Sequence, residues 1–155
     1  MDQTLIKFIV LNLVLFFGLL YFAYSEHNKA LQKQNKEKVT VFEYLNGDSP
    51  TLPTMETIGL GLVFGIVFGF MDNFGLWMGI DTLSKYIPGG TLTKAAWGNT
   101  YSDLIGSTAG TFIASVAADR LNYNDNNTPI WLNSAGIFIG CILGMFVGKL
   151  ITGKT

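Results

Sequence analysis

The chain has 155 residues, of which 49% are hydrophobic and only 14% are charged, with 18 Gly and 12 Phe. A charged share this far below the roughly 25% usual in soluble domains indicates an integral membrane protein. The net charge of −1 and the lack of a basic stripe argue against nucleic-acid binding. No nucleophile–base pair or cofactor fingerprint is present, so we expect no enzyme.

Residues 5–24 form the first apolar segment, interrupted only by Lys7 and Asn12. At 1.5 Å per residue, about 20 residues cross the roughly 30 Å hydrocarbon core of a bilayer. No small-residue cleavage site is well placed after this segment. The first arginine of the chain is Arg120, unlike an Arg-rich mitochondrial transit peptide. We therefore predict that residues 1–24 are an N-terminal transmembrane anchor.

A polar stretch follows, SEHNKALQKQNKEK at residues 25–38, which contains four Lys and is able to continue the first helix. The excess of Lys favours the cytoplasmic side of the membrane for this stretch. The turn residues and two prolines of NGDSPTLPT, at residues 46–54, mark a boundary with the remainder of the chain. Residues 25–56 are thus predicted to be a polar linker outside the membrane.

Three further apolar segments occupy residues 57–80, 95–118 and 131–151. Short polar connections join them, so neighbouring helices are expected to be antiparallel. The predicted fold is all-α, with four transmembrane helices. These are the N-terminal anchor and a tightly packed, glycine-rich three-helix core at residues 57–155.

Small residues recur at every fourth position in all three core segments, with Gly75 and Gly79 continuing the second segment out of phase. Positions i and i+4 share a helix face, and small residues there allow the close backbone contact that holds helices together in lipid. Three such helices offer more small-residue surface than one monomer readily uses, so we expect a homo-oligomer or membrane partner subunits. The predicted packing residues are Gly61, Gly65, Gly69, Gly106, Gly110, Gly136, Gly140, Gly144 and Gly148.

An Asp–Asn pair interrupts the second segment, within GFMDNFGLWMG at residues 69–79. If the helix ended before the pair, residues 58–70 would cover only about 20 Å, too little to span the bilayer. To span, the helix must continue to about Ile80, and Asp72 then lies about 12 Å inside the span. The alternative is a re-entrant break at residues 71–73, which would also bury the pair in protein.

The third segment, which crosses the membrane in the opposite direction, places its polar residues at the same depth. Residues 104–118 cover only about 22 Å, so Asn99 and Asp103 must also lie within a span. Because one short loop joins the two helices, Asp72, Asn73, Asn99 and Asp103 reach the same depth on the same side of the membrane. Asn99 and Asp103 are four residues apart and share a face.

A carboxylate at membrane depth costs several kcal/mol or more, so it pairs, takes up a proton or shares a cation. No Lys or Arg lies within the core spans, apart from Lys149 near the end of the last one. Carboxylate, amide and hydroxyl oxygens suit Ca²⁺ or Na⁺, whereas protonated acids would serve only as packing contacts. Both alternatives stay open. The candidate cation-binding residues are Asp72, Asn73, Asn99, Ser102 and Asp103, with Asp72 and Asp103 as the metal ligands.

These residues carry a family resemblance. GFMDNFGLWMGID, followed about 20 residues later by WGNTYSDLIGSTAG, resembles the core of the transmembrane protein sixty-five family over residues 59–149. The resemblance implies a three-helix membrane core, the mitochondrial inner membrane and sodium-dependent calcium export. The chain departs from the family in its N-terminal helix and in having no transit peptide. The family motif falls on Asp72, Asn73, Gly98, Asn99, Ser102, Asp103 and Gly106.

Two hypotheses follow from the sequence. In the first, the chain is a cation-handling membrane protein that uses the acidic cluster for Ca²⁺, Na⁺ or H⁺. In the second, it is a non-catalytic structural membrane protein, such as a virion internal-membrane or minor capsid component, or a subunit of a large membrane complex. The partner expected in both is the lipid bilayer, and the compartment, whether mitochondrial, bacterial or viral, stays open.

Overall fold

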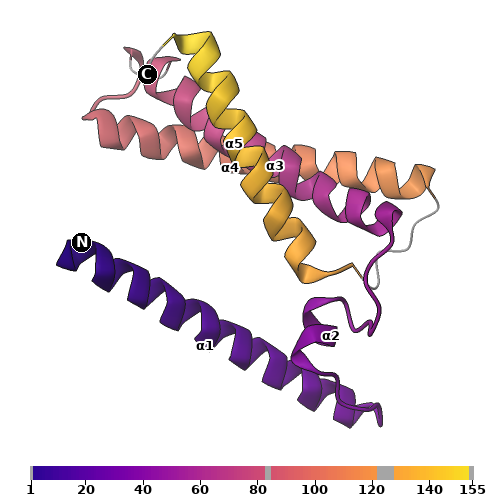
Figure 1. Cartoon of the computed structure of the whole chain (residues 1–155). Helices are drawn as coiled ribbons and strands as arrows, with labels where there is room; N and C mark the ends of the chain where they lie inside the picture. The colour runs from indigo at the N-terminus through magenta and orange to yellow at the C-terminus, as the bar shows by residue number, and fades with distance from the viewer. Residues whose placement is uncertain (1, 83–84, 122–127, 154–155) are drawn as a thin grey trace. The chain divides into compact units, whose positions relative to one another are not determined.

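A computed structural model of the chain describes residues 2–82, 85–121 and 128–153, and no strand occurs within these ranges (Figure 1). The all-α class predicted from the sequence is confirmed for this part of the chain. The chain divides into two compact units, residues 1–44 and 45–155. The helices in chain order are α1 (Gln3–Lys33), α2 (Val41–Leu45), α3 (Met55–Thr82), α4 (Thr91–Arg120) and α5 (Ile130–Thr152).

Three of the long helices have the length and composition of membrane spans, namely α1, the Met55–Gly79 part of α3, and α5. The sequence predicts a fourth span over residues 95–118, a range that α4 covers. α4 is not among the three, because Thr, Ser, Asn and Asp lower the hydropathy of a helix otherwise rich in Gly and Ala. The described part of the chain therefore contains three candidate membrane spans, one fewer than predicted, as expected of an integral membrane protein.

In the first unit, α1 is one long helix with apolar side chains on all sides. It begins after Asp2, whose carboxylate accepts a hydrogen bond from the Thr4 backbone N–H at 3.0 Å, as expected of an N-cap residue. Large apolar side chains from Leu5 to Phe22 are exposed around the helix. A helix that is apolar all round and uncovered by its own unit suits a lipid environment. It continues into the polar stretch and ends at Lys33.

After α1 the chain reverses and returns along the end of this helix. Asn28 is 7% exposed and binds the Val39 backbone twice. Its amide nitrogen donates to the Val39 carbonyl at 3.2 Å, and its oxygen accepts from the Val39 N–H at 2.9 Å. The Tyr24 hydroxyl donates to the same carbonyl at 2.9 Å. Three hydrogen bonds thus fix the returning segment beside α1, a contact that the sequence analysis did not predict.

The short helix α2 begins with a reciprocal cap formed by Thr40 and Glu43. The Thr40 N–H donates to the Glu43 carboxylate at 2.6 Å, and the Glu43 N–H donates to the Thr40 hydroxyl oxygen at 3.2 Å. This is the capping-box arrangement of helix N-termini. The hydrogen bond from the Thr40 backbone, followed by the one involving its side chain, lowers the pKa of Glu43 below its ordinary value.

We expect α2 to loosen in acid. Because the pKa of Glu43 is lower in the folded chain, its contribution to stability is present above the ordinary glutamate pKa and is lost as pH falls through the lowered value. The measurement is amide hydrogen exchange of residues 40–45 across the acidic range, in detergent micelles. A Glu43→Gln variant cannot titrate at this position, so its exchange should lack this pH step. An identical step in the variant would contradict the assignment.

In the second unit, α3 is the central helix, and both α4 and α5 pack along it (Figure 1). The α5 side of its contact with α3 consists almost entirely of glycines. A Cβ atom built on Gly136 would lie 2.5 Å from the Leu62 carbonyl oxygen, and one on Gly140 would lie 2.8 Å from the Phe70 backbone nitrogen. The two backbones therefore touch directly along the middle of the contact, and the side chains of Leu132 and Trp77 lie at its two ends. The buried residues of α5 are Leu132, Gly136, Gly140, Gly144 and Gly148.

The contact between α4 and α3 is also made at small residues, which let the two helices approach closely. A Cβ on Gly79 of α3 would lie 2.6 Å from the Gly98 Cα of α4, and one on Gly106 would lie 3.0 Å from the Met71 Cβ. The buried residues of α4 are Gly98, Ser102, Gly106 and Gly110. These are four consecutive members of the four-residue rhythm in its sequence, so the rhythm marks the face that lies against α3.

Along α3 the glycines shift from one helix face to another, and the two faces contact different helices. Gly65 and Gly69 face the α5 backbone, whereas Gly75 and Gly79 face Ser102 and Gly98 of α4. Six residues separate Gly69 from Gly75, and at 3.6 residues per turn this step rotates the glycine face by about 120°. One helix thereby presents one glycine face to α5 and another to α4.

This arrangement bears on the expected homo-oligomer. The expectation rested on small-residue surface left over after the core has packed. The glycine stripe of α5 and most of that of α4 are instead buried against α3 inside one monomer. Self-association stays a prediction, and the glycine stripes no longer argue for it.

Candidate polar site between α3 and α4

The predicted polar residues gather where α3 and α4 cross, and Ser102 connects the two helices. Its side chain is 2% exposed. The Ser102 hydroxyl lies 3.2 Å from the Asp72 carbonyl oxygen and 2.9 Å from the Asn99 carbonyl oxygen, within donating distance of both. Ser102 approaches this closely because Gly75 opposite it has no side chain, and a Cβ there would overlap the serine.

The two acidic side chains lie on opposite helices of this crossing. On α4, the Asn99 amide donates to one oxygen of the Asp103 carboxyl at 3.0 Å. On α3, the Asp72 carboxyl lies close enough to Asp103 for the two to interact electrostatically. One Asp72 oxygen, Oδ1, is buried and has no hydrogen-bond partner among the described residues. A buried acceptor without a donor is costly, and protonation of the carboxyl group lowers this cost.

Asn73 does not join this cluster. Its amide nitrogen donates to the Cys141 carbonyl of α5 at 3.0 Å, on a different side of α3. Asp72 and Asn73 are adjacent in sequence, so their side chains leave the helix about 100° apart. The structure therefore brings together Asp72, Asn99, Ser102 and Asp103, and it places Asn73 in the α3–α5 contact.

The surroundings of the acid pair offer no obvious countercharge. α3 contains no Lys or Arg, and the basic residues of α4 are Lys94 and Arg120, near its two ends. Within the described ranges, no group of three or more His, Cys, Asp or Glu residues is placed to hold a metal ion. A cation at this position would therefore have two carboxylates and only neutral oxygens as ligands.

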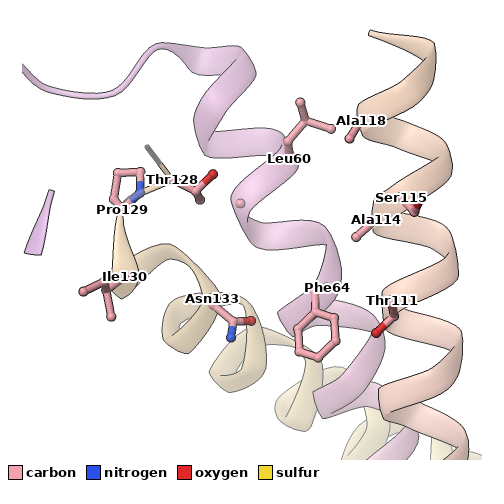
Figure 2. A pocket seen from close by; sticks show the side chains of 11 residues that line it. Leu60, Phe64, Thr111, Ala114, Ser115, Ala118, Thr128, Pro129, Ile130 and Asn133 are labelled. Carbon is pink, nitrogen blue, oxygen red and sulfur yellow. The ribbon is translucent and has the colours of Figure 1, made fainter. Parts of the chain in front are cut away.

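A groove lies away from the acid pair, where the end of α4 and the start of α5 diverge over the first turns of α3. Figure 2 shows its lining, with Leu60 and Phe64 from α3, Thr111 from α4 and Asn133 from α5. Its volume is about 640 Å³. No sequence pattern predicts this groove, although the small residues Ala114 and Ala118 that continue the α4 stripe do line it.

A second groove, of about 320 Å³, runs between α3 and α4 and includes Met71, Tyr101 and Ser102 in its lining. Neither groove is lined by Asp72 or Asp103, although Ser102 borders the second. The acid pair therefore lines neither opening, and both acids are partly exposed at the crossing of α3 and α4. Comparison of the chain with protein-family models, with curated proteins and with solved structures finds no match, so the site is interpreted from its own geometry.

Proposed function

We propose that the protein is an integral membrane protein that spans the bilayer four times and takes up a proton at the Asp72–Asp103 pair. The observation that carries the proposal is the buried, unpartnered oxygen of Asp72 beside a second carboxyl group. A single ionised Asp at the centre of a bilayer costs about 2.5–3.5 kcal/mol on insertion scales. Two ionised acids in contact would cost more, and one shared proton removes much of that cost.

A fourth span is supported by how α4 satisfies its hydroxyl groups. Thr100 donates to the Ala96 carbonyl at 3.0 Å, Thr108 to the Leu104 carbonyl at 2.8 Å, and Thr111 to the Ser107 carbonyl at 2.8 Å. Hydroxyls that bind the preceding turn of their own helix have no unsatisfied donor to expose to lipid. These hydrogen bonds within the helix would allow α4 to cross a bilayer although its hydropathy is lower than that of α3 and α5.

The neutral groups of the site favour a proton over Ca²⁺. Calcium takes six to eight oxygen ligands, and two carboxylates do not supply that number without the amides and the hydroxyl. Asn73 is engaged with α5, and the Asn99 amide nitrogen points at Asp103. The resemblance to the transmembrane protein sixty-five family stays a proposal. We favour calcium export less than proton uptake. As the transported cation, Na⁺ is less favoured than a proton and more favoured than Ca²⁺.

The second candidate is a non-catalytic structural membrane protein, in a virion or a large membrane complex. It is supported by the position of the acid pair, which lines neither groove. In this case Asp72 and Asp103 are both protonated and form a neutral packing contact, and no ion needs a path to them.

The test is flux of H⁺, Na⁺ and Ca²⁺ into liposomes that contain the purified protein. We expect proton flux from the wild type that falls at least about tenfold in Asp72→Asn and in Asp103→Asn, since a tenfold change needs only about 1.4 kcal/mol in a barrier. The control is Asp119→Asn, which makes the same change at an exposed residue near the end of α4 and should leave flux unchanged. Absence of flux from folded wild type would favour the structural candidate, and flux of Ca²⁺ alone would overturn the preference for a proton.

A further inference from the structure

Two apolar side chains on α2 are left without a partner in their own unit. Val41 is 46% exposed and Phe42 is 55% exposed. The opposite side of α2 packs on α1 through Tyr44, whose ring centroid lies 5.8 Å from that of Tyr24 and 5.1 Å from that of His27. α2 therefore has one face fixed on α1 and an apolar pair outside that contact.

The hydrogen bonds of the returning segment fix the level of α2 along α1. Val39 is bound by Tyr24 and Asn28, which are one helical turn apart, about 6 Å along the axis. Tyr24 is the last residue of the apolar stretch of α1, and Ser25 begins the polar stretch. The start of α2 therefore lies at the level where α1 passes from apolar to polar, which is the level of the membrane–water interface if α1 is a span.

The distribution of charge agrees with this level. The lysines of the segment, Lys29, Lys33, Lys36 and Lys38, are all exposed and all follow Tyr24 in the chain. They lie in the part of the helix and the turn that leads away from the apolar stretch, where water and lipid headgroups are available. Val41 and Phe42 follow these lysines in the chain and are the exposed apolar side chains of α2.

We infer that α2 is a membrane-surface anchor, and that Val41 and Phe42 insert into the headgroup region of the same bilayer that α1 crosses. The partner is the lipid surface itself. Apolar and aromatic side chains at this depth gain from leaving water, and they fix the depth of the helix to which they are attached. The inference rests on α1 being a membrane span and is independent of any proton uptake by the acid pair.

The experiment measures the depth of residue 42 in the full-length chain reconstituted in phosphatidylcholine–phosphatidylglycerol vesicles. In a Cys141→Ala background, single-cysteine variants carry a nitroxide spin label at Phe42→Cys, at Glu37→Cys and at Val14→Cys. Collision with oxygen reports lipid exposure, and collision with a water-soluble nickel chelate reports water exposure. The label at residue 37 is the aqueous reference, and the one at residue 14, within the apolar stretch, is the lipid reference.

We expect the oxygen-to-nickel ratio at residue 42 to be several-fold above that at residue 37 and below that at residue 14. Adding Asn28→Ala, which removes two of the three hydrogen bonds to Val39, should lower the ratio at residue 42 while leaving residue 14 unchanged. A ratio at residue 42 equal to that at residue 37 would overturn the inference. So would protection from both reagents, which means a protein partner, and so would a water-exposed label at residue 14, which removes the span itself.

Discussion

Replacing Gly140 by alanine is expected to destabilise the protein by about 1–3 kcal/mol or more, the range for inserting atoms into a closely packed core. The new Cβ would overlap the Ile66 carbonyl oxygen and lie 2.8 Å from the Phe70 backbone nitrogen. Both obstacles are backbone atoms of α3, so no side-chain rotation relieves the overlap. The two helices must move apart and lose contacts along the rest of their glycine faces.

The matched control is Gly59→Ala, the same change at another helical glycine. Nothing lies within 4 Å of a Cβ built at Gly59. Alanine there should be neutral or stabilising by up to about 1 kcal/mol, because glycine is the poorer helix former. The measurement is thermal unfolding of both variants in detergent, followed by circular dichroism. Equal unfolding temperatures for the two variants would contradict the packing of α5 on α3.

The second large effect is expected from Asn73→Asp. The Asn73 amide donates to the Cys141 carbonyl of α5 at 3.0 Å, and a carboxylate at this position has no proton to donate. At pH 7 the new side chain must either bury its charge or hold a proton against its ordinary pKa of about 3.9, and the second alternative costs about 4 kcal/mol. Burying the charge costs about 2.5–3.5 kcal/mol. Either way the loss exceeds that of one interhelical hydrogen bond, about 0.6–2 kcal/mol.

This prediction carries its own pH test. Below about pH 4 the carboxyl group is protonated in water as well, so its O–H can donate to the same carbonyl at little cost. Unfolding of Asn73→Asp in detergent should therefore approach the wild type at low pH and depart from it as pH rises. Asn73→Ala, which lacks a titrating group, should show a smaller loss without this dependence, and Gln32→Glu, an amide-to-acid change at an exposed position of α1, should behave as wild type. An Asn73→Asp variant no less stable than Asn73→Ala at pH 7 would argue against the hydrogen bond.

The helices and the faces by which they contact one another were largely predictable, because the four-residue spacing of small residues indicates both. In α4 and α5 the buried residues are almost all small and lie four apart, and four-residue spacing on one face can be seen in a sequence without knowing the fold. The common depth of Asp72 and Asp103 followed from the predicted helix lengths and the connection between the helices. Only the span length, the short loop and the antiparallel direction of α3 and α4 entered that argument.

What the sequence did not predict depends on the rotation of one helix against another. Asn73 was grouped with Asp72 because the two are adjacent, yet one residue turns the side chain by about 100° and into a different contact. The return of Val39 to Asn28 depends on a turn through Asn35, which has a φ of 57°. That turn leaves no periodic signal. Both features need the three-dimensional arrangement, because neither has a repeating pattern in sequence.

The rotation of the glycine face between Gly69 and Gly75 has a consequence for how the protein assembles. Since α4 and α5 meet α3 on separate faces, neither contact has to wait for the other. As the chain is made, α3 and α4 emerge first and can form their hairpin, with Ser102 bound to the Asp72 carbonyl, before α5 exists. Translation then adds α5 to a face that is already complete on α3. Damage confined to α5 would accordingly leave a two-helix intermediate that still contains the acid pair.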